Sequence, residues 1–311
     1  MTVLTATAPG KVNLCLYVAR PRRRDGLHPV VTVMQSLTLA DELRLEAAGA
    51  GVEADEVICP GVEGPNLAGR ALAAYREATG WDAPPQRLTI VKRVPVAAGM
   101  GGGSADAAAA LRLAAHAAGR PAERLLYRLA RSLGSDVPSQ LVPGRTLATG
   151  VGDQVRALSA PMSRLGYVVV PQDVPLTAAE VYREADRLGS PRSRLELGDL
   201  NVLVHTATRA GLLPADLLLN DLEAAARSLC PAIGPALEAL RAAGADRALV
   251  TGSGPTAVGL FTGPDGRARA REAAAALRDT YPLALAAEAA GPDAARVTEA
   301  PVGGVRDNGG A

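Results

Sequence analysis

A glycine-rich segment at residues 95–105 carries the residue types that bind phosphate. Glycine has no Cβ atom, so the backbone N–H groups around it can approach an anion closely and adopt positive φ. An alanine-rich stretch predicts a helix from Ser104 to about Ala118. The unpaired N–H groups and positive dipole end of such a helix attract anions. The predicted phosphate loop comprises Pro95, Val96, Ala97, Ala98, Gly99, Met100, Gly101, Gly102, Gly103, Ser104 and Ala105.

The spacing of these glycines excludes two better-known nucleotide motifs. A Gly-x-x-x-x-Gly-Lys-Ser/Thr loop needs a lysine that this segment lacks, and a Gly-x-Gly-x-x-Gly fingerprint counted from Gly99 would need glycine where Ser104 stands. A flexible linker before a helix is the remaining alternative. A strand expected at residues 86–92 delivers the chain to the loop, and the order strand, turn, helix favours phosphate binding over the linker.

Length and composition fit a folded protein long enough for two domains and offer no global attraction for polyanions, although local basic patches stay open. The chain has 311 residues, and its 33 basic and 32 acidic residues nearly cancel, so we expect neither a nucleic-acid nor a membrane partner. Three widely spaced cysteines without a Cys-x-x-Cys pair indicate neither a disulfide framework nor a zinc site. No signal segment or long apolar run is evident, so we expect a cytoplasmic protein.

Strand patterns dominate the chain before residue 160. Residues 3–8 and 12–19 alternate like two strands, and Pro9-Gly10 is expected to break the ladder between them. Pro138 is expected to limit any helix after residue 134. The other elements expected here are strands at residues 28–39, 42–46, 51–58, 86–92, 146–148 and 155–158, a helix at 66–79 capped by Asn66 and Gly80, and a helix at 122–133.

Strands interleaved with helices follow a junction near Pro161, which makes an α+β sandwich the expected class. The expected domains are residues 1–160 and 161–290, followed by a tail at 291–311 that should be loose from Val302 onward. The expected elements are strands at residues 165–170, 247–251, 256–261 and 283–287 and helices at 177–188, 200–211, 220–229, 232–243 and 265–277.

Three separated segments together resemble the GHMP small-molecule kinases. They are residues 8–14 (APGKVNL), the predicted phosphate loop, and residues 250–256 (VTGSGPT). The resemblance covers roughly residues 3–290. It implies a two-domain α+β GHMP kinase fold, with a ribosomal-protein-like N-terminal domain and a ferredoxin-like C-terminal domain. It also implies ATP-dependent phosphorylation of a small-molecule alcohol with Mg²⁺ as cofactor.

The same resemblance assigns the chemistry to two residues outside the loop. Asp136 would be the base that accepts the hydroxyl proton, and Lys11 would be its cationic partner, which keeps the carboxylate ionised. Taken alone, an Asp after Gly-Ser is more often a turn or helix cap, and a lone Lys is usually solvated. The Mg²⁺ ligands stay unknown: Ser104 is the candidate hydroxyl, whereas Asp106 is better explained as a complement to the helix dipole.

A narrower set of motifs resembles one branch of the family, whose acceptor is a cytidyl diphosphate sugar alcohol of the non-mevalonate isoprenoid pathway. The motifs are KVNL at residues 11–14, DGLH at 25–28, GGGSAD at 101–106, GSDVP at 134–138 and NDLE at 220–223. The resemblance implies that the acceptor contacts Asn13, His28, Tyr182, Gly252, Ser253 and Gly254.

The acceptor side departs from the family pattern at one position. Many members carry an aromatic residue where this chain has Leu27, so the stacking of the cytosine should be looser or differently arranged. Three alternatives stay open from the residues alone: His28 as a turn residue, Gly252–Gly254 as a hairpin turn, and the basic turn at residues 20–26 as a solvated loop, which we favour over a phosphate contact.

Two other functions remain to be tested. One is a different GHMP activity, such as that of a homoserine, mevalonate or sugar kinase, against which the motifs at residues 25–28 and 220–223 argue. The other is a catalytically silent ligand-binding homologue, which the presence of both Lys11 and Asp136 disfavours. We expect a monomer or a weak homodimer.

Overall fold

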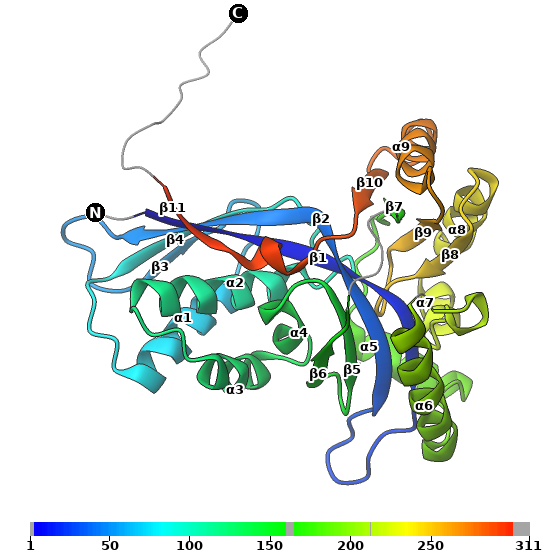
Figure 1. Ribbon diagram of the computed structural model, residues 1–311, viewed down its shortest axis with the longest axis horizontal. Helices are drawn as coiled ribbons and strands as arrows, with labels where there is room; N and C mark the ends of the chain where they lie inside the picture. The colour runs from blue at the N-terminus through cyan, green and yellow to red at the C-terminus, as the bar shows by residue number, and fades with distance from the viewer. Residues whose placement is uncertain (1–2, 160–164, 212, 301–311) are drawn as a thin grey trace, which may run out of the picture.

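Two long antiparallel strands cross the N-terminal half and reach the C-terminal half, where the Leu16 N–H donates to the Leu219 carbonyl at 2.8 Å (Figure 1). The computed structural model describes residues 3–159, 165–211 and 213–300. β1 (Val3–Val18) pairs with β2 (Val30–Ala47) from Leu4 opposite Leu45 to Val18 opposite Val30. The expected break at Pro9-Gly10 is wrong, since the strand continues through a register shift between Pro9 and Lys11. The irregularity turns the Lys11 N–H toward the Met100 carbonyl, 2.8 Å away.

Helices cover one face of the sheet that contains these strands (Figure 1). Its order is β11-β1-β2-β4-β3, with β5 and β6 paired beside β2. The further strands are β3 (Glu56–Ile58), β4 (Gln86–Val91), β5 (Arg145–Thr149) and β6 (Gln154–Ala157), and the covering helices are α1 (Leu67–Thr79), α2 (Gly102–Ala117) and α3 (Glu123–Leu133). Four consecutive alanines of α2 at 107–110 are fully buried, and their small side chains let α1 and the sheet approach closely.

Helix ends follow the capping residues of the sequence. The Asn66 side chain accepts from the Ala68 N–H at 2.8 Å, and Gly80 closes α1 with φ +61°, as predicted. Pro138 lies in the first turn of a short helix, α4 (Val137–Leu141), because proline is tolerated where no helical N–H bond is needed. The sequence analysis missed this helix.

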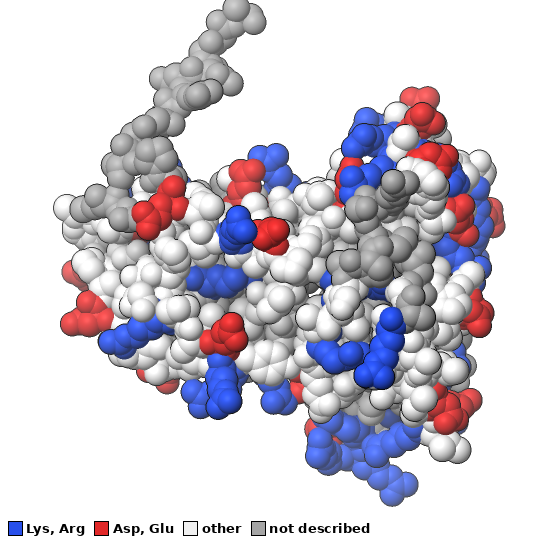
Figure 2. Space-filling view, in the orientation of Figure 1, with Lys and Arg blue, Asp and Glu red and all other residues white. Residues whose placement is uncertain are grey.

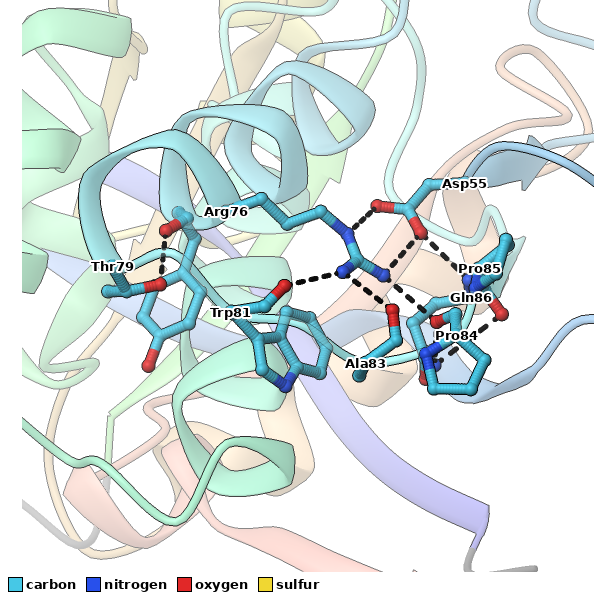
Figure 3. Close-up of polar contacts among 9 residues, drawn as sticks. Asp55, Arg76, Thr79, Trp81, Ala83, Pro84, Pro85 and Gln86 are labelled. Atoms are coloured by element: carbon cyan, nitrogen blue, oxygen red, sulfur yellow. Dashed lines mark hydrogen bonds and ion pairs between the residues drawn. The ribbon is translucent and has the colours of Figure 1, made fainter.

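Arg76, near the end of α1, ties that helix to the loop before β4 (Figure 3). Its guanidinium donates to both carboxylate oxygens of Asp55, at 2.6 and 2.8 Å. Its other hydrogens reach the carbonyls of Trp81, Ala83 and Pro84 at 2.8–3.0 Å. All five guanidinium donors are therefore matched, and this bidentate pair locks the α1–β4 connection.

A second sheet, ordered β10-β7-β9-β8 and entirely antiparallel, carries the C-terminal half. The expected α+β fold is confirmed. The elements of this half are β7 (Gly166–Val170), α5 (Ala178–Leu188), α6 (Arg194–Ala210), α7 (Glu223–Leu229), α8 (Ile233–Ala242), β8 (Arg247–Val250), β9 (Ala257–Phe261), α9 (Gly266–Leu277) and β10 (Leu285–Glu288). α6 begins six residues before its expected start, at a capping box made by Ser193 and Glu196.

The chain then returns to the first sheet. β11 (Val297–Ala300) pairs antiparallel with β1, and the Thr5 and Thr298 hydroxyls lie 2.7 Å apart. The sequence analysis assigned no strand here. The expected junction at Pro161 and the expected loose segment from Val302 lie outside the described residues. Among the helices of residues 3–300 that the structure describes, none is long and apolar enough to cross a membrane.

Candidate active site

The predicted phosphate loop lines a cavity of about 370 Å³ at the start of α2. Gly101, with φ +69°, is the N-cap of that helix. The N–H groups of the next three residues, 102–104, make no backbone hydrogen bond within the described chain. Residues 95–104 all line the cavity, whereas Ala105 does not: it is buried, and its N–H donates to the Gly101 carbonyl at 2.9 Å. The loop thus presents free donors and a helix dipole to the cavity.

The glycines of the loop serve different purposes. A Cβ atom on Gly99, where φ is +71°, would lie 2.7 Å from the Gly254 carbonyl oxygen, so this glycine allows the two glycine loops to touch. A Cβ atom on Gly102 would face Val94 and the Lys92 ammonium, whereas one on Gly103 would meet no atom within 4 Å. Gly103 lines the first cavity and faces open space, so a side chain there would meet no described protein atom within 4 Å.

Lys11 and Asp136 meet in a second cavity, of about 310 Å³, whose lining includes Gly99, Gly101 and Ser104 of the loop. Lys11 is 4 % exposed, and its Nζ donates to Asn13 Oδ1 at 2.8 Å and to the Gly99 carbonyl at 2.9 Å. Its Nζ lies 3.6 Å from Asp136 Oδ2. A buried ammonium held by these acceptors stabilises negative charge beside it.

The Asp136 side chain is 38 % exposed and is not engaged as a cap. The residue occupies the N-cap position of α4, yet its carboxylate makes no capping hydrogen bond. The alternative that it serves only as a helix cap therefore lacks its defining contact. The carboxylate faces the cavity with Lys11 as its cationic neighbour.

Asn13 joins the two halves at this point. Its backbone N–H donates to the Thr251 hydroxyl at 2.9 Å, and its Nδ2 donates to the Thr32 hydroxyl at 2.8 Å. Asn220 holds the facing glycine loop, since its Nδ2 donates to the carbonyls of Val250 and Gly252 at 2.7 and 2.8 Å. Gly252 and Ser253 line the second cavity, whereas Gly254 packs against Gly99.

A third cavity, of about 400 Å³, contains the predicted nucleobase residues. The His28 ring lies 4.9 Å from the Tyr182 ring, and its Nδ1 is 2.9 Å from the Ala19 carbonyl. Its Nε2 lies 3.4 Å from Asp186 Oδ2. Leu27 lines the cavity with half of its surface exposed, so it covers less of the space than an aromatic ring would.

The three cavities adjoin one another and share wall residues. Gly99, Gly101 and Ser104 line the first and the second, while Ser135, Val151 and Tyr182 line the second and the third. Lys11 and Asp136 therefore lie between the phosphate loop and the space beside His28.

Two of the four arginines of the basic turn at residues 20–26 pair with the acid of the same turn. Arg22 donates to both Asp25 oxygens, at 3.0 and 2.5 Å, and Arg24 lies 3.3 Å from the same carboxylate. The Arg22 hydrogen bond lowers the pKa of Asp25. This self-pairing supports the solvated-turn interpretation, with Gly26 and Leu27 at the rim of the third cavity.

A buried charge cluster that the sequence analysis did not identify lies beside the phosphate loop. Lys92 contacts both Asp41, which is fully buried, and Asp106, whose Oδ2 is 2.7 Å away. Burial raises the pKa of Asp106 to about 7, although Lys92 opposes the shift. Asp106 Oδ1 is buried and has no hydrogen-bond partner in the part of the chain that the structure describes. Asp106 is thus held by a lysine, which a role as helix-dipole complement alone does not explain.

Other wall residues escaped the sequence analysis because single positions carried no signal. Asn66, Leu67 and Cys59 line the first cavity, and Asp186 and Arg183 line the third. Asp186 follows Tyr182 by four residues on α5, a spacing that places both on one helix face. This four-residue spacing is the sequence signal that could have identified Asp186 as a wall residue.

Metal binding has a limited donor set here. Within residues 3–300 as described, no three His, Cys, Asp or Glu side chains cluster to hold an ion. Ser104, whose hydroxyl is the candidate ligand, lines both the first and the second cavity. One protein oxygen fits a Mg²⁺ that keeps most of its coordination from substrate phosphates and water.

A phosphate cradle, an ion-paired carboxylate and an α+β two-sheet fold together define a small-molecule kinase site, and the chain belongs to the GHMP kinase family. The family described as "GHMP kinases N terminal domain" matches residues 66–144, and the family described as "GHMP kinases C terminal" matches residues 205–283.

Several relatives share one printed name, 4-diphosphocytidyl-2-C-methyl-D-erythritol kinase. The chain is 42 % identical to the one from Nocardioides sp. over 299 residues, covering 90 % of this chain and 95 % of that protein. It is 40 % identical to the Thermobifida fusca protein over 308 residues, covering 94 % and 96 %. A crystal structure of 4-(cytidine 5'-diphospho)-2C-methyl-D-erythritol kinase matches with a TM-score of 0.72 and 36 % identity, covering 92 % of this chain and all of that one.

More distant structures share the fold alone. A homoserine kinase from Cytophaga hutchinsonii matches with a TM-score of 0.71 at 16 % identity, covering 96 % of this chain and 97 % of that one.

Proposed function

We propose that this protein transfers the γ-phosphoryl group of ATP to the 2-hydroxyl of 4-diphosphocytidyl-2-C-methyl-D-erythritol. The observation that carries the proposal is the position of Lys11 and Asp136, 3.6 Å apart, in a cavity that shares walls with the phosphate loop on one side and with the space beside His28 on the other. The relatives' shared name supports the choice of acceptor over homoserine, mevalonate or a sugar.

The phosphate loop would hold the triphosphate with the free N–H groups at residues 102–104. Asp136 would accept the proton of the acceptor hydroxyl as its oxygen attacks the γ-phosphorus. The bond from that phosphorus to the β-γ bridging oxygen breaks, and ADP leaves. Lys11, anchored by Asn13 and the Gly99 carbonyl, would hold the carboxylate and stabilise the charge that develops.

The cytosine ring of the acceptor would occupy the third cavity. His28 and Tyr182 form one wall, and Leu27 offers an apolar surface in place of an aromatic one. Gly252 and Ser253 line the second cavity from the C-terminal half, and the acceptor's diphosphate would lie in that cavity beside them. The Mg²⁺ that such reactions use would neutralise the triphosphate, with Ser104 as the protein hydroxyl nearest to it in this assignment.

An ADP-release assay with a panel of acceptors tests the proposal. We expect turnover with 4-diphosphocytidyl-2-C-methyl-D-erythritol and at most trace release with homoserine, mevalonate or galactose. Preferred turnover of another acceptor would overturn the substrate assignment while keeping the kinase class. Tight ATP binding without turnover of any acceptor would instead indicate a silent homologue.

A further inference from the structure

A groove of about 760 Å³ lies apart from the three cavities of the candidate site, between α3, α4 and the β5–β6 hairpin. None of its lining residues is shared with them. Leu126 of α3, Leu141 of α4 and Val155 of β6 supply apolar walls, and Val142 lines it with 51 % of its surface exposed. The volume is in the range of small-molecule sites.

Basic residues border this apolar surface without acidic partners. Arg112 of α2 and Arg124 and Arg128 of α3 line the groove, and Glu123 is the acid among its lining residues. Within the described chain, no carboxylate lies at ion-pair distance from any of these three arginines. Figure 2 shows Lys and Arg side chains along the lower margin of this half of the molecule, where α3 lies in Figure 1.

Among the described residues, Arg112 is bound by carbonyl groups alone. Its Nη1 donates to the Gln140 carbonyl at 2.7 Å, its Nη2 donates to the Thr7 carbonyl at 3.1 Å, and its buried Nε has no partner there. Burial lowers the pKa of Arg112 to about 10, which leaves the group cationic at neutral pH. A desolvated cation with only neutral acceptors favours an anion nearby.

We propose that this groove binds a small amphipathic anion, an alkyl chain with a carboxylate or phosphate head, and that its occupancy acts on Asp136 through α4. The chain would lie on the apolar walls, and the head would approach the arginines, with Glu123 disfavouring a second negative charge at one end. This matching of apolar surface and unpaired positive charge distinguishes the ligand from a neutral or cationic amphiphile.

The route to the candidate active site is short. α4 begins directly after Asp136 and supplies Pro138 and Leu141 to the groove. Arg112 ties the last turn of α4 to β1, the strand that also carries Lys11. An anion that draws the Arg112 guanidinium away from the Gln140 and Thr7 carbonyls would therefore loosen α4 and change the distance between Asp136 and Lys11. The effect of the bound anion on Asp136 rests on the proposed kinase function, whereas the binding of the anion in the groove does not.

Isothermal titration calorimetry with decyl phosphate and with decanoate, below their micelle-forming concentrations, tests binding independently of turnover. We expect saturable binding near one equivalent for at least one of them, and the stronger of the two identifies the head group. Inorganic phosphate, decyltrimethylammonium and decyl maltoside should bind at least tenfold more weakly. Equal binding of the cationic or neutral amphiphile would overturn the assignment, as would no binding of either anion.

Variants locate the ligand without disturbing Arg112, whose loss could impair folding. Replacing the two groove-lining arginines of α3 (R124E and R128E) should weaken anion binding at least tenfold, and Val142→Trp should fill the groove and block it. Arg209→Glu, an exposed charge reversal on α6, is the control for a charge change outside the groove, and thermal unfolding verifies each fold. Unchanged affinity in all groove variants would place the ligand elsewhere and overturn the proposal.

Coupling to Asp136 is read from steady-state kinetics. Saturating anion should lower kcat severalfold in the wild type and leave the Val142→Trp variant unaffected. Binding in the groove with unchanged wild-type kinetics would overturn the coupling. A wild-type protein that binds the anion but phosphorylates no acceptor would overturn the proposed function while the groove assignment stands.

Discussion

The phosphate side and the nucleobase side of the candidate site are built in different ways. The phosphate side consists of backbone: free N–H groups at residues 102–104 and two glycine loops in contact at Gly99 and Gly254. The nucleobase side consists of side chains: His28 from the loop before β2, and Tyr182 and Asp186 from α5. The half-exposed Leu27 lies at its rim. Backbone packed as closely as at Gly99 and Gly254 tolerates almost no added atoms, whereas a side-chain site can be repacked. Substitutions should therefore cost more on the phosphate side.

Asp136, which lies between the two sides, should show the largest effect. Asp136→Ala removes the proposed base, so kcat should fall by about 10²- to 10⁴-fold, the usual contribution of general base catalysis. ATP affinity should change little, because the loop N–H groups remain. ADP-release kinetics and calorimetric ATP titration measure the two, with exposed Asp199→Asn as the control. Near-normal turnover would exclude Asp136 as the base.

The glycines test the backbone side. Gly99→Ala places a Cβ atom 2.7 Å from the Gly254 oxygen at φ +71°, so the free energy of unfolding should fall by about 1–3 kcal/mol. Gly103→Ala is the matched control, because nothing lies within 4 Å and alanine favours helix. Urea denaturation measures both. Equal losses for the two variants would contradict the different purposes assigned to these glycines.

Gly103 also tests where the phosphates lie. Gly103→Val should keep the fold and weaken ATP binding by about tenfold or more, equivalent to ~1.4 kcal/mol, because its branched side chain enters the loop cavity. Calorimetric ATP titration measures the change. Wild-type affinity in this variant would move the triphosphate away from the start of α2.

The Asp106 cluster gives the phosphate side a pH dependence. The folded-state pKa of Asp106 is raised from 3.8 to about 7, so the folded protein binds more protons than the unfolded chain between these values. The free energy of unfolding should therefore fall as pH rises through this window and then level off. Asp106→Asn should flatten that slope, measured by denaturation at several pH values. An unchanged slope would assign the titration to other groups.

Leu27 should show the smallest effect. Leu27→Tyr restores an aromatic surface at the third cavity, and stacking of about 0.5–1.5 kcal/mol should lower KM for the cytidyl acceptor by roughly two- to tenfold with kcat unchanged. Kinetics with varied acceptor measure the change. A higher KM would mean that the base does not lie beside residue 27.

Local sequence signals predicted local structure well. Asn66 and Gly80 delimit α1 as expected, because a cap depends only on neighbouring residues. The continuity of β1 through Pro9 was not predictable, since the irregularity is accommodated by a hydrogen bond from Lys11 to Met100, 89 residues away. β11 was missed for a similar reason, as its partner is the first strand of the chain.

The sequence by itself determined the glycine loop, the helix that follows it and the family motifs, because residue type and spacing are local properties. Tertiary structure alone decided which glycine faces ligand space and which faces another loop. It also decided that Lys92 lies between Asp41 and Asp106, and that the Asp136 carboxylate makes no capping hydrogen bond to α4. These outcomes depend on distances between segments far apart in the chain, and such distances are set by packing of the whole fold.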